Sequence, residues 1–162
     1  MNPYAEIFSA FQKAKIKYLI VGGVAVNLYG YSRFTADVDI LLALDEKNIQ
    51  KMNSLMEEMG YVPRLPVQLH ELRDQKKVQD WIKNKNFKAY TFLSSRGLRL
   101  DIDILAEESL KFEELYKDKS RIKIWDIAVP VVSMNYLISM KKKAARDQDL
   151  IDLKALLKLK SE

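Results

Sequence analysis

The segment Asp37-Val-Asp-Ile-Leu-Leu-Ala-Leu44 constrains the fold most, because it is a strand pattern that is apolar on both faces after its first residues. Successive strand side chains point to opposite faces of a sheet, so this strand is predicted to lie centrally, with cover on both sides. The two-residue spacing of Asp37 and Asp39 puts both carboxylates on one face. Unit charges about 6–7 Å apart repel by roughly 2–3 kcal/mol at an effective dielectric near 20. The pair therefore indicates either a divalent cation between the two carboxylates or a strand end that is well exposed to solvent.

The rest of the chain alternates helical and extended patterns. Helices are predicted over 4–14, over 24–29, from an N-cap at Asp45 to Gly60, and over 71–84, and strands over 18–21, 87–93, 98–105 and 122–132. The two strands at 87–93 and 98–105 flank Ser94-Ser-Arg-Gly97, which is predicted to be a hairpin loop. Because a hairpin interrupts the alternation, the predicted fold class is α+β, or mixed α/β, and not a purely parallel sheet.

The sequence pattern of the C-terminal thirty residues predicts a helical tail. Ser133 is its predicted N-cap, and a break is predicted near Arg146-Asp147. A length of 162 residues suits one domain with a short helical appendage. We therefore expect a core over 1–132 and an appendage over 133–162 that packs on it.

Composition excludes several classes of function. Cysteine is absent, which excludes disulfides, thiolate zinc sites and cysteine nucleophiles and predicts a cytoplasmic protein. No apolar run approaches the roughly 18–20 residues that span a bilayer, so no membrane association is expected. The net charge of +5 favours anionic partners, although a lysine-rich surface explains a modest excess equally well.

A glycine pair, Gly22-Gly23, lies between a predicted strand and a predicted helix. Glycine there lets backbone N–H groups approach an anion, and the following helix N-terminus favours phosphate. The alternative is a tight turn with no ligand. Arg33 and Thr35, which lie between this pair and Asp37, suit a triphosphate or the lip of its pocket, although either is also ordinary in a surface loop.

A second carboxylate pair, Asp101 and Asp103, again occupies one face of a predicted strand. If this strand lies beside 37–44, three or four carboxylates converge on a site that suits Mg²⁺. Two metal ions would then activate an attacking oxygen and steady a leaving pyrophosphate. The third carboxylate is a metal ligand or the base that accepts a hydroxyl proton. Both aspartates remain candidates; Asp101 is preferred because it opens its strand, as Asp37 and Asp39 open theirs.

The strings Val21-Gly-Gly23, Gly30-Tyr-Ser-Arg-Phe-Thr-Ala-Asp-Val-Asp-Ile40 and Leu100-Asp-Ile-Asp-Ile104 resemble the DNA polymerase beta superfamily of nucleotidyltransferases. They match its glycine pair, its Asp-x-Asp and its third carboxylate. Within the superfamily, the chain is similar to the minimal bacterial and archaeal nucleotidyltransferases and to the type IV abortive-infection toxins. The lincosamide nucleotidyltransferases are the second most similar group. The resemblance covers about residues 15–157 and implies the nucleotidyltransferase fold, a central mixed sheet flanked by helices.

The resemblance implies transfer of a nucleoside monophosphate from ATP or another NTP to an acceptor: a tRNA end, a protein hydroxyl or a small molecule. It implies Mg²⁺, with Mn²⁺ as second candidate, and an antitoxin partner. The implied catalytic residues are Asp37, Asp39, Asp101 and Asp103, with Asp37, Asp39 and Asp101 as metal ligands. The implied nucleotide-binding residues are Gly22, Gly23, Arg33, Thr35, Lys141, Arg146 and Asp149. The alternative is an inactive nucleotide-binding or partner-binding module of the same fold, as one component of a toxin–antitoxin pair.

Overall fold

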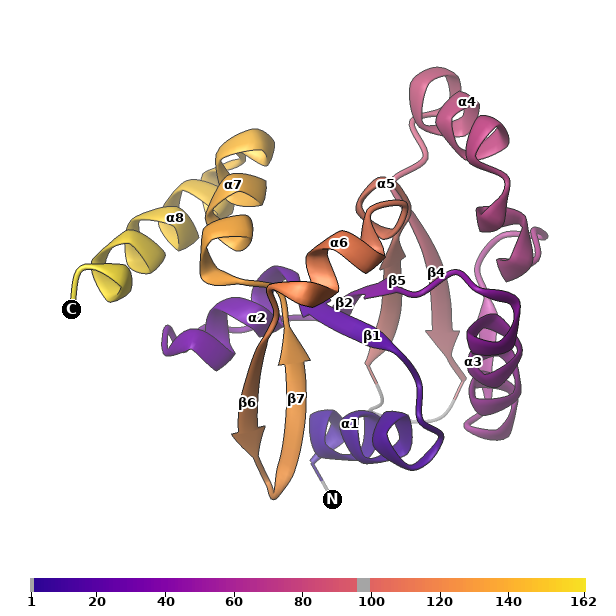
Figure 1. Ribbon diagram of the computed structural model, residues 1–162, viewed down its shortest axis with the longest axis horizontal. Coiled ribbons are helices and arrows are strands. Elements are labelled where there is room, and N and C mark those ends of the chain that lie inside the picture. Colours follow the sequence, from indigo (N-terminus) through magenta and orange to yellow (C-terminus); the bar gives the residue numbers. More distant parts are fainter. Residues whose placement is uncertain (1, 96–99) are drawn as a thin grey trace.

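The structure is a computed structural model that describes residues 2–95 and 100–162 (Figure 1). The helices are α1 (Pro3–Lys13), α2 (Gly22–Tyr29), α3 (Glu46–Glu58), the 3-10 helix η1 (Leu69–Arg73), α4 (Gln75–Lys85), α5 (Ala106–Ser109), α6 (Phe112–Lys117), α7 (Met134–Ala144) and α8 (Asp147–Lys160). The strands are β1 (Tyr18–Val21), β2 (Asp37–Leu42), β3 (Tyr61–Pro63), β4 (Ala89–Ser94), β5 (Asp101–Leu105), β6 (Ser120–Ile124) and β7 (Ile127–Val131).

The strands form one mixed sheet in the order β3-β4-β5-β2-β1-β7-β6. Strand β2 pairs in parallel with β5 and antiparallel with β1, which itself runs parallel to β7. Val38, Ile40 and Leu41 of β2 have no exposed surface. The predicted mixed α/β class and the central position of this strand are therefore confirmed.

Helices gather at both ends of the sheet, and α1, α5 and α6 lie between the two groups (Figure 1). Helices α7 and α8 pack on each other and on α2 at one end, and α3 and α4 lie at the other end, beside η1. Over the described residues, no helix has both the length and the hydropathy that a bilayer crossing requires. The division into a core over 1–132 and an appendage over 133–162 stays a prediction.

Side-chain caps begin the helices where the sequence predicted. Asp45 accepts a hydrogen bond from the backbone N–H of Asn48, and Ser133 accepts one from that of Tyr136. The predicted break in the tail is also present, because α7 ends at Ala144 and Ala145 adopts a left-handed φ of 50°. The chain turns at this residue, so the two tail helices can pack against each other.

Two predicted elements differ in the structure. Residues 122–132, predicted as one strand, belong to the β6–β7 hairpin, whose turn residues Trp125 and Asp126 have φ of 49° and 62°. Positive φ at both positions is the geometry of a tight hairpin, but Trp-Asp carries none of the usual Asn-Gly signal. The helix predicted over 71–84 is split, because Asp74 caps the start of α4. Residues 96–99, which include the end of the predicted hairpin loop and the start of the strand predicted over 98–105, lie outside the described part of the chain.

Candidate active site

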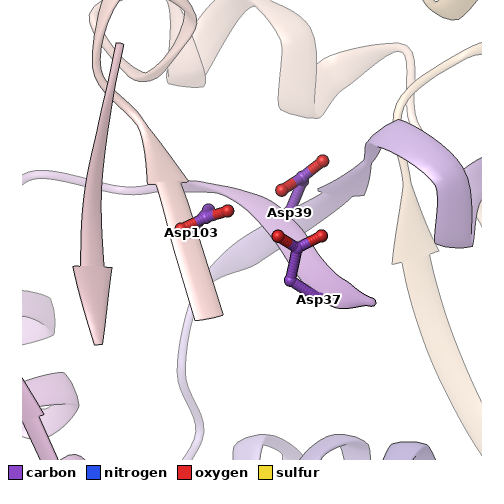
Figure 2. Close-up of side chains that lie close together, drawn as sticks. All are labelled: Asp37, Asp39 and Asp103. Atoms are coloured by element: carbon purple, nitrogen blue, oxygen red, sulfur yellow. The ribbon is translucent and has the colours of Figure 1, made fainter. Parts of the chain in front are cut away.

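Two adjacent parallel strands bring acidic side chains together. Their register places Asp37 opposite Asp101 and Asp39 opposite Asp103. Carboxylate oxygens of Asp37, Asp39 and Asp103 all lie within 4.8 Å of one another, and the three side chains point toward a common point (Figure 2). Acids from two strands thus share one face of the sheet.

The structure places Asp103, and not the preferred Asp101, in the carboxylate cluster. The Asp101 Oδ1 atom accepts a hydrogen bond from the backbone N–H of Ser94 at 2.9 Å, so this side chain is turned toward β4. Asp103 takes the third place in the cluster, and its carboxylate accepts a hydrogen bond from the Thr91 hydroxyl. The strand register explains why Asp103 lies in the cluster. Asp103 lies directly opposite Asp39, which is more buried than Asp37.

The cluster is electrostatically strained without a cation. Burial raises the pKa of Asp39 to about 7, repulsion by Asp37 and Asp103 adds to the rise, and Lys141 opposes it. Burial likewise raises the pKa of Asp37, together with the charge of Asp103, and the guanidinium of Arg64 opposes this rise. Because every candidate ligand atom is a carboxylate oxygen, the site suits a hard divalent cation such as Mg²⁺.

The glycine pair packs directly beside this cluster at the start of α2. Gly22 has a φ of +67°, and a Cβ atom added there would overlap Oδ2 of Asp39. A Cβ atom on Gly23 would lie 2.6 Å from Cγ2 of Thr35 and 2.8 Å from a guanidinium nitrogen of Arg33. Glycine is required at both positions so that the helix start can approach the carboxylates and the 33–35 loop. The first N–H groups of a helix have no intrahelical partner and can bind an anion.

The predicted loop residues lie at the same place. Thr35 is buried and hydrogen-bonds the Tyr4 hydroxyl, which fixes it to α1. A guanidinium nitrogen of Arg33 donates to Oδ2 of Asp152 at 3.0 Å. The Nε atom of Arg33 lies 2.8 Å from Oδ1 of Asp152 as an ion pair without hydrogen-bond alignment. Arg33 is therefore held between α2 and α8.

The tail residues form a buried ion-pair network. Lys141 is 6% exposed, whereas its neighbours Lys142 and Lys143 are exposed. The Lys141 Nζ atom lies 3.1 Å from Oδ1 of Asp149 and 3.0 Å from Oδ2 of Asp152. Burial would raise the pKa of Asp149, but hydrogen bonds from Arg146 and Lys141 outweigh it and hold the pKa at about 2. Of the three consecutive lysines, Lys141 is the one whose charge acts on Asp39.

Sequence reasoning missed Asp152, which is fully buried and contacts both Arg33 and Lys141. A signal was available, because Asp149 and Asp152 are three residues apart on one helix and share a face. It also missed Thr91, whose partner Asp103 lies opposite it in the β4–β5 pair.

The assembled site combines three chemical elements. A carboxylate cluster suits a divalent cation, a glycine turn presents backbone N–H groups, and Arg33 and Lys141 add positive charge beside them. Cation, N–H groups and basic side chains are the usual means by which proteins bind and activate polyphosphates.

Comparison with known proteins agrees with this chemistry. A family model described as "Nucleotidyl transferase AbiEii toxin, Type IV TA system" matches residues 8–162. No curated protein sequence matches the chain significantly.

Several solved structures share the fold. The lincosamide antibiotic adenylyltransferase LnuA, lincomycin-bound, superposes with a TM-score of 0.66 at 17% identity, covering 97% of this chain and 96% of the other. An antigenic nucleotidyltransferase-like protein from Paracoccidioides brasiliensis gives 0.61 at 15% identity, with coverage of 96% and 73%. ANT(2")-Ia in complex with adenylyl-2"-tobramycin gives 0.61 at 13% identity, with coverage of 94% and 84%. At such identities these matches show the fold alone.

Proposed function

The chain belongs to the family of AbiEii nucleotidyl transferase toxins of type IV toxin–antitoxin systems, and we propose that it transfers a nucleoside monophosphate to an acceptor hydroxyl. In this proposal, Asp37, Asp39 and Asp103 bind the Mg²⁺ that the reaction requires. The observation that carries the proposal is the convergence of these three carboxylates beside the glycine turn. Neither feature alone implies the reaction, but together they provide a cation site next to a phosphate site.

The donor set supports Mg²⁺, and Mn²⁺ would also fit. Three carboxylate oxygens without a nitrogen or sulfur donor suit hard cations. A bound cation would supply the positive charge that stabilises negative charge on the reacting phosphate. It would also favour ionised Asp39, whose pKa burial raises to about 7.

The remaining groups bind and orient the nucleotide. The N–H groups at Gly22 and Gly23, at the start of α2 and beside Thr35, would bind the phosphates. Lys141 adds positive charge from the tail, and the Arg146–Asp149 and Lys141–Asp149 contacts fix its position. Arg33, which is held by its ion pair with Asp152, lines the nucleotide-binding side of the site together with Lys141.

Asp103 is the group that we assign to the acceptor side. The acceptor oxygen would form a bond to the α-phosphorus while the bond from that phosphorus to the pyrophosphate oxygen breaks. The proton of the acceptor hydroxyl would pass to a carboxylate of the cluster. The hydroxyl of Thr91 orients the Asp103 carboxylate for this role.

The acceptor candidates are a tRNA end, a protein hydroxyl and a small molecule. Two structural neighbours were solved with lincomycin and with adenylyl-2"-tobramycin, which supports testing small acceptors. The family name supports an antitoxin as a partner in the cell. The alternative, an inactive nucleotide-binding module, gains no support from the site, in which all three carboxylates converge.

The test is transfer of radiolabelled NMP. Purified protein is incubated with each α-labelled NTP and Mg²⁺, with total RNA, cell protein, lincomycin or tobramycin as acceptor. We expect label in one acceptor with the wild type and none with Asp39→Asn. Calorimetry with NTP and Mg²⁺ runs in parallel, and binding without transfer to any acceptor would instead identify a nucleotide-binding module.

A further inference from the structure

The loop between α2 and β2, residues 30–36, contains no helix or strand, yet it is held on both sides of Phe34. The backbone N–H of Arg33 donates to Oδ1 of Asn27 in α2 at 2.9 Å. The hydroxyl of Thr35 hydrogen-bonds the hydroxyl of Tyr4 in α1. Phe34, between these two contacts, is 85% exposed. The surrounding helices therefore give this irregular loop a defined position.

The hydroxyl of Tyr4 contacts Thr35 through two groups. It lies 3.2 Å from the carbonyl oxygen of Thr35 and also within hydrogen-bond distance of the side-chain hydroxyl. A phenol can donate to the carbonyl while it accepts from the Thr35 hydroxyl, so both groups are satisfied together. Thr35 is buried, so water has little access to replace Tyr4. The contact consequently holds both the backbone and the side chain of Thr35.

Tyr4 is itself held firmly at the start of α1. Its backbone N–H donates to Oδ1 of the N-cap residue Asn2 at 2.8 Å, and Pro3 occupies the first turn. Ile7 and Phe8 of the same helix are buried in the core. The Tyr4–Thr35 contact thus connects the loop to a packed helix that lies 31 positions earlier in the sequence.

The side chain of Thr35 presents its methyl group to the glycine turn. A Cβ atom added to Gly23 would lie 2.6 Å from Cγ2 of Thr35, whereas the Thr35 hydroxyl is bonded to Tyr4. Rotation of the Thr35 side chain would break this bond and move the methyl group away from Gly23 at the same time. The contact with Tyr4 therefore fixes the surface on which the glycine turn packs.

We propose that Tyr4 is a positioning residue for phosphate binding, because its hydroxyl holds Thr35, and with it the 33–35 loop, in the conformation that supports the Gly22-Gly23 turn. The part that concerns phosphate rests on the proposed function, whereas the contact itself orders the free protein. Since the loop is ordered before a triphosphate binds, less conformational entropy is lost on binding.

Two single variants remove the same hydrogen bond from opposite sides. Tyr4→Phe removes the phenolic hydroxyl and keeps the ring that packs against the core. Thr35→Val removes the threonine hydroxyl and keeps a methyl group toward Gly23. Because both variants lose one bond, the double variant Tyr4→Phe/Thr35→Val should show no further effect.

The matched control is Tyr29→Phe. The hydroxyl of Tyr29 also contacts one side-chain hydroxyl, that of Ser120, and one carbonyl, that of Val132, at 3.1 and 2.7 Å. Tyr29 lies at the end of α2 opposite to the glycine pair. The control therefore loses the same kind of contact away from the phosphate site.

The first measurement is cleavage of the ligand-free chain by chymotrypsin after Phe34, quantified by mass spectrometry. Loss of one hydrogen bond should make local opening of the loop, and hence this cleavage, about fivefold faster in Tyr4→Phe and in Thr35→Val. Tyr29→Phe should stay within about twofold of the wild type at this bond. Unchanged cleavage after Phe34 in Tyr4→Phe would show that the contact does not order the loop.

The second measurement is calorimetry with inorganic triphosphate and Mg²⁺, a probe that has no base. We expect each single variant to bind about fivefold more weakly than the wild type and the double variant to bind no more weakly than either, whereas independent effects would multiply to about 25-fold. The rise in melting temperature that Mg²⁺ alone produces should be the same in Tyr4→Phe and in the wild type, because Tyr4 contacts no carboxylate of the cluster.

The outcomes separate this proposal from the proposed function. Wild-type affinity for triphosphate in Tyr4→Phe would overturn the positioning role alone. So would a much larger loss in Thr35→Val than in Tyr4→Phe, which would instead indicate direct contact between the Thr35 hydroxyl and a phosphate. A wild type that binds neither triphosphate nor any NTP with Mg²⁺ would refute the proposed function and the phosphate part of this proposal, while the cleavage rates would still decide whether Tyr4 orders the loop.

Discussion

Asp39 of β2 lies directly opposite Asp103 of β5 in a parallel strand pair, so two acids that are 64 positions apart in sequence become immediate neighbours. With Asp37 they form a carboxylate cluster on one face of the sheet. The mutual repulsion of these charges is unfavourable for the metal-free fold, and it is the property that suits the cluster to a divalent cation.

Asp39→Asn should stabilise the metal-free protein at alkaline pH while abolishing transfer. The pKa of Asp39 is raised from 3.8 to about 7 in the folded state, so the folded protein retains protons that the unfolded chain has released. The stability of the wild type should therefore fall as pH rises from about 4 to 7, by about 2–4 kcal/mol in chelator, and much less in the variant.

Thermal unfolding in EDTA at pH 5 and pH 8 measures this difference. Addition of Mg²⁺ at pH 8 should raise the melting temperature of the wild type but not that of Asp39→Asn. Identical pH profiles for the two proteins would contradict the account of the cluster.

Asp103→Asn and Asp101→Asn should separate the two aspartates of β5. Asp103 belongs to the cluster, so its amide variant should lose at least a hundredfold in transfer rate, an effect of about 3 kcal/mol on the barrier. In Asp101→Asn, the amide oxygen that replaces the carboxylate can still accept the hydrogen bond from the Ser94 N–H, so this variant should keep activity within about fivefold. Single-turnover kinetics with labelled NTP measure the transfer rates of the two variants. A larger loss of rate in Asp101→Asn than in Asp103→Asn would instead identify Asp101 as the third carboxylate.

Gly22→Ala should damage the site more than the fold. The left-handed φ of +67° costs an L-residue roughly 1–2 kcal/mol, and the new methyl group would push against the Asp39 carboxylate. We expect a moderate loss of stability in urea and a loss of NTP and Mg²⁺ binding in calorimetry.

Gly30→Ala is the matched control, because Gly30 also has a positive φ, of +123°, but its Cβ would meet only Leu159 at 3.5 Å. Its stability should fall at least as much, because +123° lies outside the left-handed region open to L-residues, while ligand binding is kept. Equal binding by the two variants would show that the close approach of Gly22 to Asp39 is not needed.

Asp152→Ala should destabilise the protein by about 3–5 kcal/mol, because it leaves Arg33 and Lys141 without their shared partner in a buried setting. Urea unfolding measures this, and KM for the NTP should rise as Arg33 loses its anchor. Glu113→Gln removes the exposed pair with Lys17, 3.4 Å apart, and should change stability by less than about 1 kcal/mol. Equal effects of the two substitutions would rule out a structural role for the network.

Much of the local structure could be predicted from the sequence. Asp45 and Ser133 cap their helices as expected, since a capping side chain and its backbone N–H lie only three residues apart. The apolar run that follows Asp39 placed β2 in the centre of the sheet for an equally local reason. The β6–β7 turn escaped prediction because Trp125 and Asp126 are unusual residues for positive φ and are held there by the pairing of the flanking strands.

Local patterns were therefore enough to predict that Asp37 and Asp39 share a face of their strand, that Asp101 and Asp103 share a face of theirs, and that a glycine pair begins a helix nearby. The packing of the folded chain was needed to show that Asp103 joins the cluster and that Asp152 links Arg33 to Lys141. Side-chain alternation along a strand fixes the face on which a residue lies, but it does not fix the register of that strand against another strand. Register and buried ion pairs depend on packing between segments far apart in the chain, which no local pattern encodes.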